Sequence, residues 1–296
     1  MIFFDRPVKT YMKLIHTLLI LFSISFFSPN ILSAENCQNF MPDKSELIWA
    51  DVEFAISGDT LVIQNQKARL IGLDAPQKER KQKFNTPGEP LADESQEYLN
   101  KLIANKDLKI GVLYDKTKVD KFGRQLIHAF FEDGTNVQTE MLKAGLAIYR
   151  PEFNNNRFAN CLIEAEQKAR DGEYQLWDLL KKNPELHYPL IESSEIFAED
   201  EGYRIIRGKV VKVDKSSRYI IINMDTTGVR IPKRAWKNFN YENLQSLKDK
   251  TIEVRGLVYH YKGSMFTVIE TPFAINNCAQ QKLRKLYQQK PNKPAL

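Results

Sequence analysis

The sequence predicts a β-rich α+β protein in which a five-stranded barrel with packed helices is followed by a second small β-barrel-like domain. Two groups of five apolar or alternating runs, bounded by turn residues, fall within residues 49–131 and 204–269. A stretch with prolines and an acidic run, residues 179–202, separates the two groups. With 296 residues, 43% of them hydrophobic, the chain is long enough to bury the cores of about one to two domains.

The first 34 residues are predicted to be an export signal rather than part of the fold. A basic start at Lys13 precedes a mostly apolar run over residues 14–27, and small residues suited to cleavage end at Ala34. The apolar run is shorter than the roughly 20 residues that span a bilayer, which disfavours a membrane anchor. We therefore expect a periplasmic or secreted protein that has no membrane attachment after cleavage.

The first group is predicted as a three-stranded antiparallel meander, followed by a helix, two more strands and two more helices. The strands are expected at residues 49–56, 60–64, 68–73, 108–114 and 126–131. The helices are expected where apolar residues recur at helical spacing, at residues 91–103, 137–144 and 161–170. Five strands with helices packed on one side are typical of an OB-type barrel.

The second group has the same number of strands and predicts an OB-like domain over residues 203–278. Its strands are expected at residues 204–213, 219–223, 229–232, 251–258 and 265–269, with a short helix near 243–247. Cations and aromatics intermix in this group, a composition that suits single-stranded nucleic acid but also suits the core and surface of any small barrel. The complete division is a signal at 1–34, a first domain at 35–178, a linker at 179–202, the second domain, and a basic tail at 279–296.

The sequence contains no motif for a zinc site and none for a common catalytic nucleophile. His128, His187 and His260 are widely separated, and the chain has neither a Cys-x-x-Cys pair, a Gly-x-Ser-x-Gly elbow nor a phosphate loop. The net charge of +6 and the pI near 9.0 suit a polyanionic partner, although a balance this mild also occurs in proteins with no nucleic-acid role.

Three cysteines permit one disulfide bridge. A bridge between Cys37 and Cys278 would join the two ends of the folded body, and Cys161 paired with either is equally allowed by the count. A buried, unpaired Cys161 on a helix is the remaining alternative, because free cysteine packs as a small hydrophobic residue.

Three short motifs place two carboxylates and two arginines in sequence order. Ser-Gly-Asp-Thr contains Asp59, Arg-Leu-Ile-Gly-Leu-Asp-Ala-Pro contains Arg69 and Asp74, and Asp-Lys-Phe-Gly-Arg ends at Arg124. Carboxylates are hard oxygen ligands for a divalent cation, and an arginine fork can hold a phosphate oxygen as charge develops. The set predicts a metal-dependent phosphodiester site.

Two geometric conditions follow from this prediction. A tight turn at Gln66 and Lys67 would pair Asp59 directly with Asp74, and a bound cation would offset the repulsion; a turn one residue earlier would shift the register. Arg69 and Asp74 are five residues apart, which places them on opposite faces of a regular strand. Only a bulge or sharp bend, at Gly72, would bring them into one site.

These motifs are followed by two more segments, Met-Leu-Lys-Ala-Gly-Leu-Ala at a helix end and Gln-Leu-Trp-Asp further on. In this order the segments resemble the staphylococcal nuclease (thermonuclease) family over residues 52–177. The resemblance implies an OB-type barrel with helices. It also implies a calcium-dependent hydrolase that cuts DNA and RNA with little sequence preference. The second domain resembles, more weakly, the OB-like modules that follow the nuclease domain in some bacterial members.

Residue roles are implied by position in the matching motifs. Asp59, Asp74 and the Ala75 carbonyl correspond to the calcium ligands of the family, and Arg69 and Arg124 to its phosphate clamps. Nucleic-acid contact is assigned to Lys121 and Tyr149, with a core tyrosine as the alternative for Tyr149.

One departure bears on catalysis. The family has Asp-x-Pro-Glu, with the glutamate activating water, whereas this chain has Gln77 at that position. An amide cannot take the proton, and losing a general base costs roughly 10²- to 10⁴-fold in rate. Glu79, Asp93 or Glu94 would have to substitute, or Gln77 would orient a water that the metal ion has already acidified.

Three functions remain. The first is an exported calcium-dependent nuclease that needs no obligate protein partner. The second is a catalytically weakened nuclease-fold protein that binds nucleic acid. The third is an envelope scaffold that uses both barrels for protein contacts.

Overall fold

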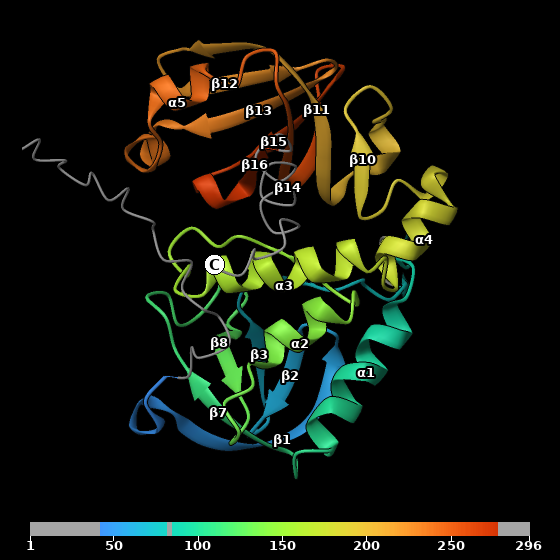
Figure 1. The fold of residues 1–296 in the computed structure, drawn as a ribbon, viewed down its shortest axis with the longest axis vertical. Helices are drawn as coiled ribbons and strands as arrows, with labels where there is room; N and C mark the ends of the chain where they lie inside the picture. Colours follow the sequence, from blue (N-terminus) through green and yellow to red (C-terminus); the bar gives the residue numbers. More distant parts are fainter. Residues whose placement is uncertain (1–41, 82–84, 278–296) are drawn as a thin grey trace, which may run out of the picture.

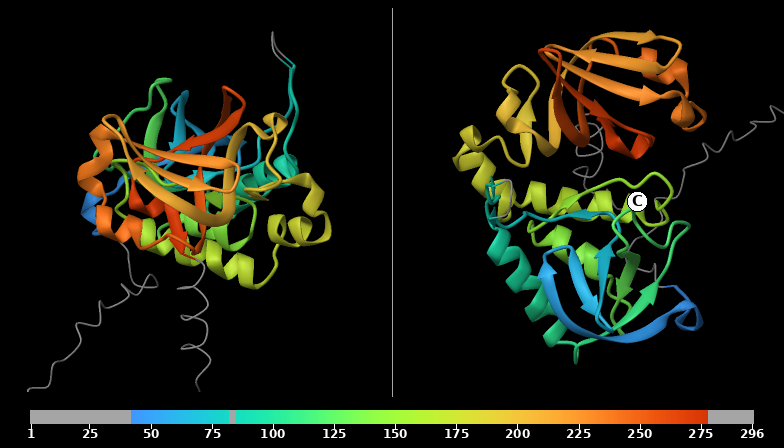
Figure 2. Two further views of the ribbon diagram at one scale, coloured as in Figure 1. Left: turned by 90° about the horizontal axis from the view of Figure 1, so that it is seen from above. Right: turned by 180° about the vertical axis from the view of Figure 1, so that it is seen from behind.

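This computed structural model describes residues 42–81 and 85–277 of the chain. The predicted signal, Cys37, Cys278 and the basic tail lie outside those residues. Figure 1 shows two barrel-like groups of strands with the helix α3 lying between them, and the view from behind in Figure 2 agrees. No helix within the described residues is both long enough and apolar enough to cross a membrane.

The first barrel is closed and has the five strands that the sequence predicts. In barrel order these are β1 (Ile48–Ser57), β2 (Thr60–Ile63), β3 (Gln66–Leu70), β8 (Gln125–Phe130) and β7 (Lys109–Leu113). The β3–β8 pair is parallel and the other four pairs are antiparallel. Two small two-stranded sheets join β4 (Leu73–Asp74) to β9 (Ile148–Tyr149) and β5 (Arg80–Lys81) to β6 (Asn85–Thr86).

The β2–β3 hairpin turns at Gln64 and Asn65, not at Gln66 and Lys67. Ile63 pairs with Gln66, and both turn residues have positive φ, 51° and 59°, as in the tight turns that match strand twist. The predicted direct pairing of Asp59 with Asp74 is therefore wrong.

A bend at Gly72 ends β3 and directs the chain into β4. Gly72 has φ of 81°, a conformation that costs glycine little, and an added Cβ would lie 2.3 Å from a Leu162 methyl carbon. After the bend, Leu73 pairs with Tyr149 in the β4–β9 sheet. The break that the sequence required between Arg69 and Asp74 is confirmed at the predicted residue.

Three helices pack against the first barrel, α1 (Ala92–Ala104), α2 (Val137–Lys143) and α3 (Ala159–Asp171), and α4 (Leu176–Lys182) follows them in the chain. The first three lie where helical periodicity predicts them. Leu99 and Ile103 of α1 are fully or almost fully buried in the barrel core, and Asn136 caps α2 by accepting the Thr139 N–H at 2.9 Å. The helices thereby close one side of the barrel and present α3 to the second domain.

The second sheet contains seven strands: β10 (Leu190–Glu192), β11 (Gly202–Lys215), β12 (Tyr219–Met224), β13 (Thr227–Pro232), β14 (Thr251–Tyr261), β15 (Ser264–Val268) and β16 (Ile275–Asn277). Because β11 pairs with both β12 and β14, five of them form a ring in the order β11, β12, β13, β15, β14. The β13–β15 pair is parallel, so this ring repeats the strand connectivity of the first barrel. The short helix α5 (Tyr241–Gln245) begins two residues before the predicted one.

The predicted linker carries regular structure. It holds the end of α4, two short 3-10 turns and β10, which pairs in parallel with β11. The 3-10 turns of the described chain are η2 (Lys44–Glu46), η3 (Pro184–Leu186), η4 (Ala198–Asp200), η5 (Lys233–Asn238) and η6 (Pro272–Ala274). An apolar cluster that includes Ile148, Trp177 and Ile205 then joins the first domain to the second sheet.

Cys161 on α3 is buried and disulfide-bonded. The interpretation of a free, buried thiol is therefore wrong. Because the chain has three cysteines, a bridge between Cys37 and Cys278 is also excluded. The partner of Cys161 lies outside the described residues.

Candidate active site

Asp59 lies in the β1–β2 turn and is only 1% exposed. Its Oδ1 accepts the hydroxyls of Ser57 at 2.9 Å and Thr60 at 2.8 Å. Its Oδ2 accepts Arg69 Nη1 at 3.0 Å and the Ala75 N–H at 3.1 Å. Burial raises the pKa of Asp59, but Arg69 and these hydrogen bonds outweigh burial and hold the pKa below its usual range. The carboxylate is thus ionised, with four donors for its roughly four lone-pair directions.

Arg69 lies between the two predicted carboxylates. Its Nη1 bonds to Asp59, and its Nη2 lies 3.3 Å from Asp74 Oδ1 and donates to the Leu73 carbonyl at 2.8 Å. The Arg69 side chain is 8% exposed. The sequence predicted a cation between Asp59 and Asp74, and the structure places a guanidinium there.

A second arginine, Arg150, also reaches Asp74. It directly follows β9, and its Nη1 donates to Asp74 Oδ1 at 2.7 Å. Its backbone N–H donates to the Gly72 carbonyl, and its guanidinium lies over the Tyr203 ring of the second barrel, 4.9 Å from the ring centroid. Burial raises the pKa of Asp74 and outweighs the attraction of the two arginines, with Asp59 adding to the rise.

Gln77 and Glu89 form a second part of the site. Gln77 Nε2 donates to the Ala75 carbonyl at 2.7 Å, and the Gln77 N–H donates to Glu89 Oε2 at 2.9 Å. The other Glu89 oxygen accepts Arg204 Nη1 of the second barrel at 3.1 Å. Burial raises the pKa of Glu89 above its usual range. No sequence motif indicated Glu89.

Glu152 is a further acid of this site that no sequence motif indicated. Burial raises its pKa, while Arg150, Arg69 and Arg124 lower it and Asp74 raises it further. Its carboxyl group therefore lies within the electrostatic field of three arginines and one carboxylate.

The loop that joins β7 to β8 carries the exposed cations. Arg124 Nε bonds to Asp120 Oδ2 at 2.7 Å, and the Arg124 side chain is 26% exposed. Phe122 is 71% exposed, with Lys121 Nζ 5.0 Å and the Arg124 guanidinium carbon 5.5 Å from its ring centroid. The structure thus brings Asp59 and Asp74 into contact with Arg69, and it leaves Arg124 in the β7–β8 loop, bonded to Asp120.

Two other assignments change. Tyr149 is 2% exposed in the core of the first barrel, so its ring is not available to stack on a base, and the core interpretation holds. Among the acids considered as substitute bases, Asp93 pairs with Lys78 and Glu79 with Lys81. Their described ion pairs are therefore with lysines outside the Asp59–Asp74 cluster.

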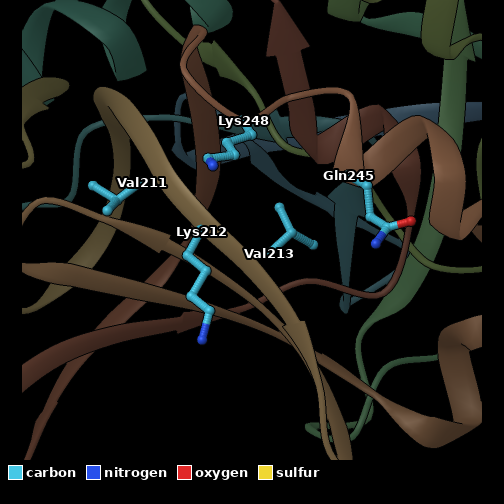
Figure 3. Close-up of a pocket in the computed structure, with 5 residues that line it drawn as sticks. All are labelled: Val211, Lys212, Val213, Gln245 and Lys248. Carbon is cyan, nitrogen blue, oxygen red and sulfur yellow. The ribbon is translucent and has the colours of Figure 1, made fainter.

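Within residues 42–81 and 85–277, no three His, Cys, Asp or Glu side chains lie together in a way that would hold a metal ion. A pocket on the second barrel lies elsewhere (Figure 3). It is lined by Val211, Lys212, Val213, Gln245 and Lys248. None of these residues belongs to the carboxylate cluster, which consists of Asp59 and Asp74 with Arg69 and Arg150.

Comparison with known proteins finds similarity in the first domain. Residues 67–179 match the model of a family described as staphylococcal nuclease homologue. A stretch of 169 residues is 27% identical to an uncharacterized protein of Methanocaldococcus jannaschii, covering 49% of this chain and 79% of that protein. Asp59 and the second barrel lie outside the residues that the family model matches.

Two further relatives carry names that describe an activity. Ribonuclease TUDOR 1 of Arabidopsis thaliana is 26% identical over 158 residues, covering 50% of this chain and 14% of that protein. Probable endonuclease LCL3 of Komagataella phaffii is 29% identical over 117 residues, covering 38% and 48%. The chain therefore matches less than half of the length of these two relatives.

Proposed function

We propose that this protein, in which residues 67–179 form a staphylococcal-nuclease-like domain, is an exported hydrolase that cuts phosphodiester bonds of DNA and RNA with little sequence specificity. The observation that carries the proposal is the convergence of Asp59, Arg69 and Asp74 in one buried cluster, with Arg124 close enough to act on the same Glu152 carboxyl as Arg69. The names of two relatives, a ribonuclease and a probable endonuclease, support the same reaction class.

The exposed loop supplies the contacts for a nucleic acid. Lys121 and Arg124 carry positive charge for the phosphate backbone, and the exposed ring of Phe122 offers a base a stacking surface. Phe122, rather than the buried Tyr149, would then stack on a base. Arg124 would also stabilise negative charge that develops on the phosphoryl oxygens, because its fork can hold two oxygens at once.

The resemblance implies calcium, to be held by Asp59, Asp74 and the Ala75 carbonyl, where it would polarise the phosphoryl group. In the described arrangement all four Asp59 acceptor directions receive donors, and the Ala75 carbonyl accepts the Gln77 amide. Calcium takes about six to eight oxygen ligands. These residues as arranged do not fit the ion.

A second function, binding of nucleic acid with little or no cutting, is favoured by one specific observation. The side chain at the water-activating position, Gln77, is an amide that donates to Ala75 and cannot accept a proton. The cations and the exposed ring would still bind a single strand. This alternative needs the same loop and differs only in its lack of turnover.

Export remains part of the proposal and has one structural support. Cys161 is disulfide-bonded, and disulfides persist mainly in oxidising compartments such as the periplasm or the cell exterior. We propose DNA and RNA as the partners and no obligate protein partner.

Digestion of circular single-stranded and double-stranded DNA and of RNA, by protein beginning at Glu35, tests the proposal. The reactions are run with calcium and with chelator, and Arg124→Ala is compared with Lys101→Ala, which removes an exposed, ion-paired cation from α1. We expect cutting that falls about 10²-fold or more in Arg124→Ala and is unchanged in Lys101→Ala. Binding of the same substrates without cutting under either condition would replace the hydrolase with the binding function.

A further inference from the structure

We propose that Arg150 is a phosphate-binding residue of this site and that the second barrel holds it there. On this view, the site takes its positive charge at Asp74 from Arg150 and binds nucleic acid without a divalent cation. The inference rests on the proposed function, since it concerns the same site and the same polyanionic substrate.

Arg150 is the accessible arginine of the carboxylate cluster. Arg69 is 8% exposed and gives its terminal nitrogens to Asp59, Asp74 and the Leu73 carbonyl. The Arg150 side chain is 38% exposed while its Nη1 holds Asp74. A phosphate that approaches the cluster from solvent therefore meets Arg150, whose planar fork has further N–H donors for a second anion.

The second barrel fixes Arg150 in two ways. The Tyr203 ring on β11 lies under the guanidinium, 4.9 Å away. Arg255 on β14 donates to the carbonyl of Tyr149, the preceding residue, at 2.8 Å. Arg255 also bonds to both Glu166 oxygens, at 3.0 and 2.8 Å, and Glu166 Oε1 accepts the Tyr149 N–H at 3.0 Å. Tyr149, the residue before Arg150, is thus hydrogen-bonded at both its backbone N–H and its backbone carbonyl.

A second contact between the domains reaches the same site. Arg204, next to Tyr203, bonds to Glu89, which in turn accepts the Gln77 N–H. The second barrel therefore supports the chain on both sides of the carboxylate cluster. Tyr203, Arg204 and Arg255 are positioning residues here, because they act through Arg150 and Glu89.

Charge balance explains why a guanidinium suits this cluster. Asp59 and Asp74 supply two carboxylates, and Arg69 and Arg150 supply two positive charges within 2.7 to 3.3 Å of them. Because each of these carboxylates already has a guanidinium partner, a calcium ion would have to displace Arg69 or Arg150 to bind the same oxygens. A phosphate would instead bind through the N–H donors of Arg150 that Asp74 does not use.

Binding of a fluorescent single-stranded oligonucleotide, measured by anisotropy in chelator over a range of salt concentrations, tests the role of Arg150. We expect tight binding by the wild type, a loss of roughly tenfold to a hundredfold in Arg150→Gln, and partial recovery in Arg150→Lys. We also expect the slope of log affinity against log salt to shrink by about 0.7 in Arg150→Gln, as for one lost contact to a single strand. Arg157→Gln, which removes an exposed arginine paired with Glu46, is the matched control and should leave affinity and slope unchanged.

Two Tyr203 variants test the support from the second barrel. Tyr203→Ala removes the ring and should weaken binding about as much as Arg150→Gln, with no further loss in the double variant. Tyr203→Phe keeps the ring and removes a buried hydroxyl that has no hydrogen-bond partner, so it should retain the affinity that Tyr203→Ala loses. If Tyr203→Ala does not fold by circular dichroism, the partly exposed Arg150 variants still decide the proposal.

Calcium binding, measured by isothermal titration calorimetry without nucleic acid, gives an independent readout. We expect no uptake at millimolar calcium in the wild type. Uptake of one calcium ion by the wild type, or an unchanged oligonucleotide affinity and salt slope in Arg150→Gln, would overturn the inference. Failure of the proposed function is a different result, in which the wild type neither binds nor cuts nucleic acid.

Discussion

The buried charged side chains of the site are stabilised by ion pairs and hydrogen bonds with specific neighbouring residues. Asp59 and Asp74 share Arg69 yet shift in opposite directions, with the pKa of Asp59 lowered by four donors and the pKa of Asp74 raised by burial. The sequence could predict that these three residues meet, because their motifs are local and contiguous. It could not predict Arg150 or Glu89, whose roles depend on partners in the second barrel.

Gln77→Glu tests how much the missing base limits the reaction. The glutamate would restore a proton acceptor and remove the amide that donates to the Ala75 carbonyl. We expect kcat/KM on circular single-stranded DNA to rise by about 10²-fold or more. Gln245→Glu, the same change on the remote helix α5, should have no effect. An unchanged rate in Gln77→Glu would show that this position does not limit turnover.

At the scale of elements, the strands and helices were predictable, and their register was not. The periodicity of the sequence located all ten ring strands within a few residues. The hairpin register depends on which two residues adopt positive φ, and Gln64 and Asn65 do so without a glycine to signal it. The β4–β9 sheet escaped prediction because it joins two-residue strands that are 75 residues or so apart in the chain.

Gly72→Ala tests whether the bend after β3 holds the site together. The alanine would combine a strained φ with a Cβ placed 2.3 Å from Leu162. We expect a loss of roughly 2 kcal/mol or more in the free energy of unfolding, measured by urea denaturation, with weakened oligonucleotide binding. Gly123→Ala is the matched control, since its φ is +79° and no atom lies within 4 Å of an added Cβ. Equal losses in the two variants would show that strain alone, and not packing at Leu162, governs the bend.

At the scale of the whole molecule, the two barrels form one packed unit. The sequence suggested two domains joined by a linker. It did not reveal the ion pairs between them, because these join residues that are far apart in the chain: Arg255 and Glu166 are 89 positions apart. Glu253 on β14 also bonds to Arg170 on α3 at 2.7 Å and to Arg207 at 2.8 Å. Buried pairs of this kind are visible only once both domains are folded.

Acid should weaken the contact between the barrels. Burial raises the pKa of Glu253, but Arg170 and Arg207 outweigh it and lower the pKa to about 2. A lowered carboxyl pKa contributes stability that is complete above the unfolded value of about 4.5 and is lost as the pH falls toward about 2. We expect a loss of about 3 kcal/mol over that window, followed by thermal unfolding.

The variant Glu253→Gln isolates this effect. It should be less stable at neutral pH, because it removes the buried carboxylate that both Arg170 and Arg207 contact, and its stability should change less between pH 4.5 and 2.5. Glu97→Gln, on an exposed face of α1 beside Lys101, serves as the control and should keep the wild-type profile. A wild-type profile in Glu253→Gln would assign the acid sensitivity to other carboxylates.

The two rings share a strand order but not the acidic residues of the site. The turn between the first two strands carries Asp59 in the first ring, whereas the equivalent turn of the second ring, residues 216–218, has no acid. The second ring has the same architecture without the carboxylates, and it supports the site through Tyr203 and Arg255. An excised first barrel, grafted onto another scaffold, would carry Asp59 and Asp74 but leave Arg150 without its aromatic support and Glu166 without Arg255. The smallest transplantable unit is therefore the pair of barrels.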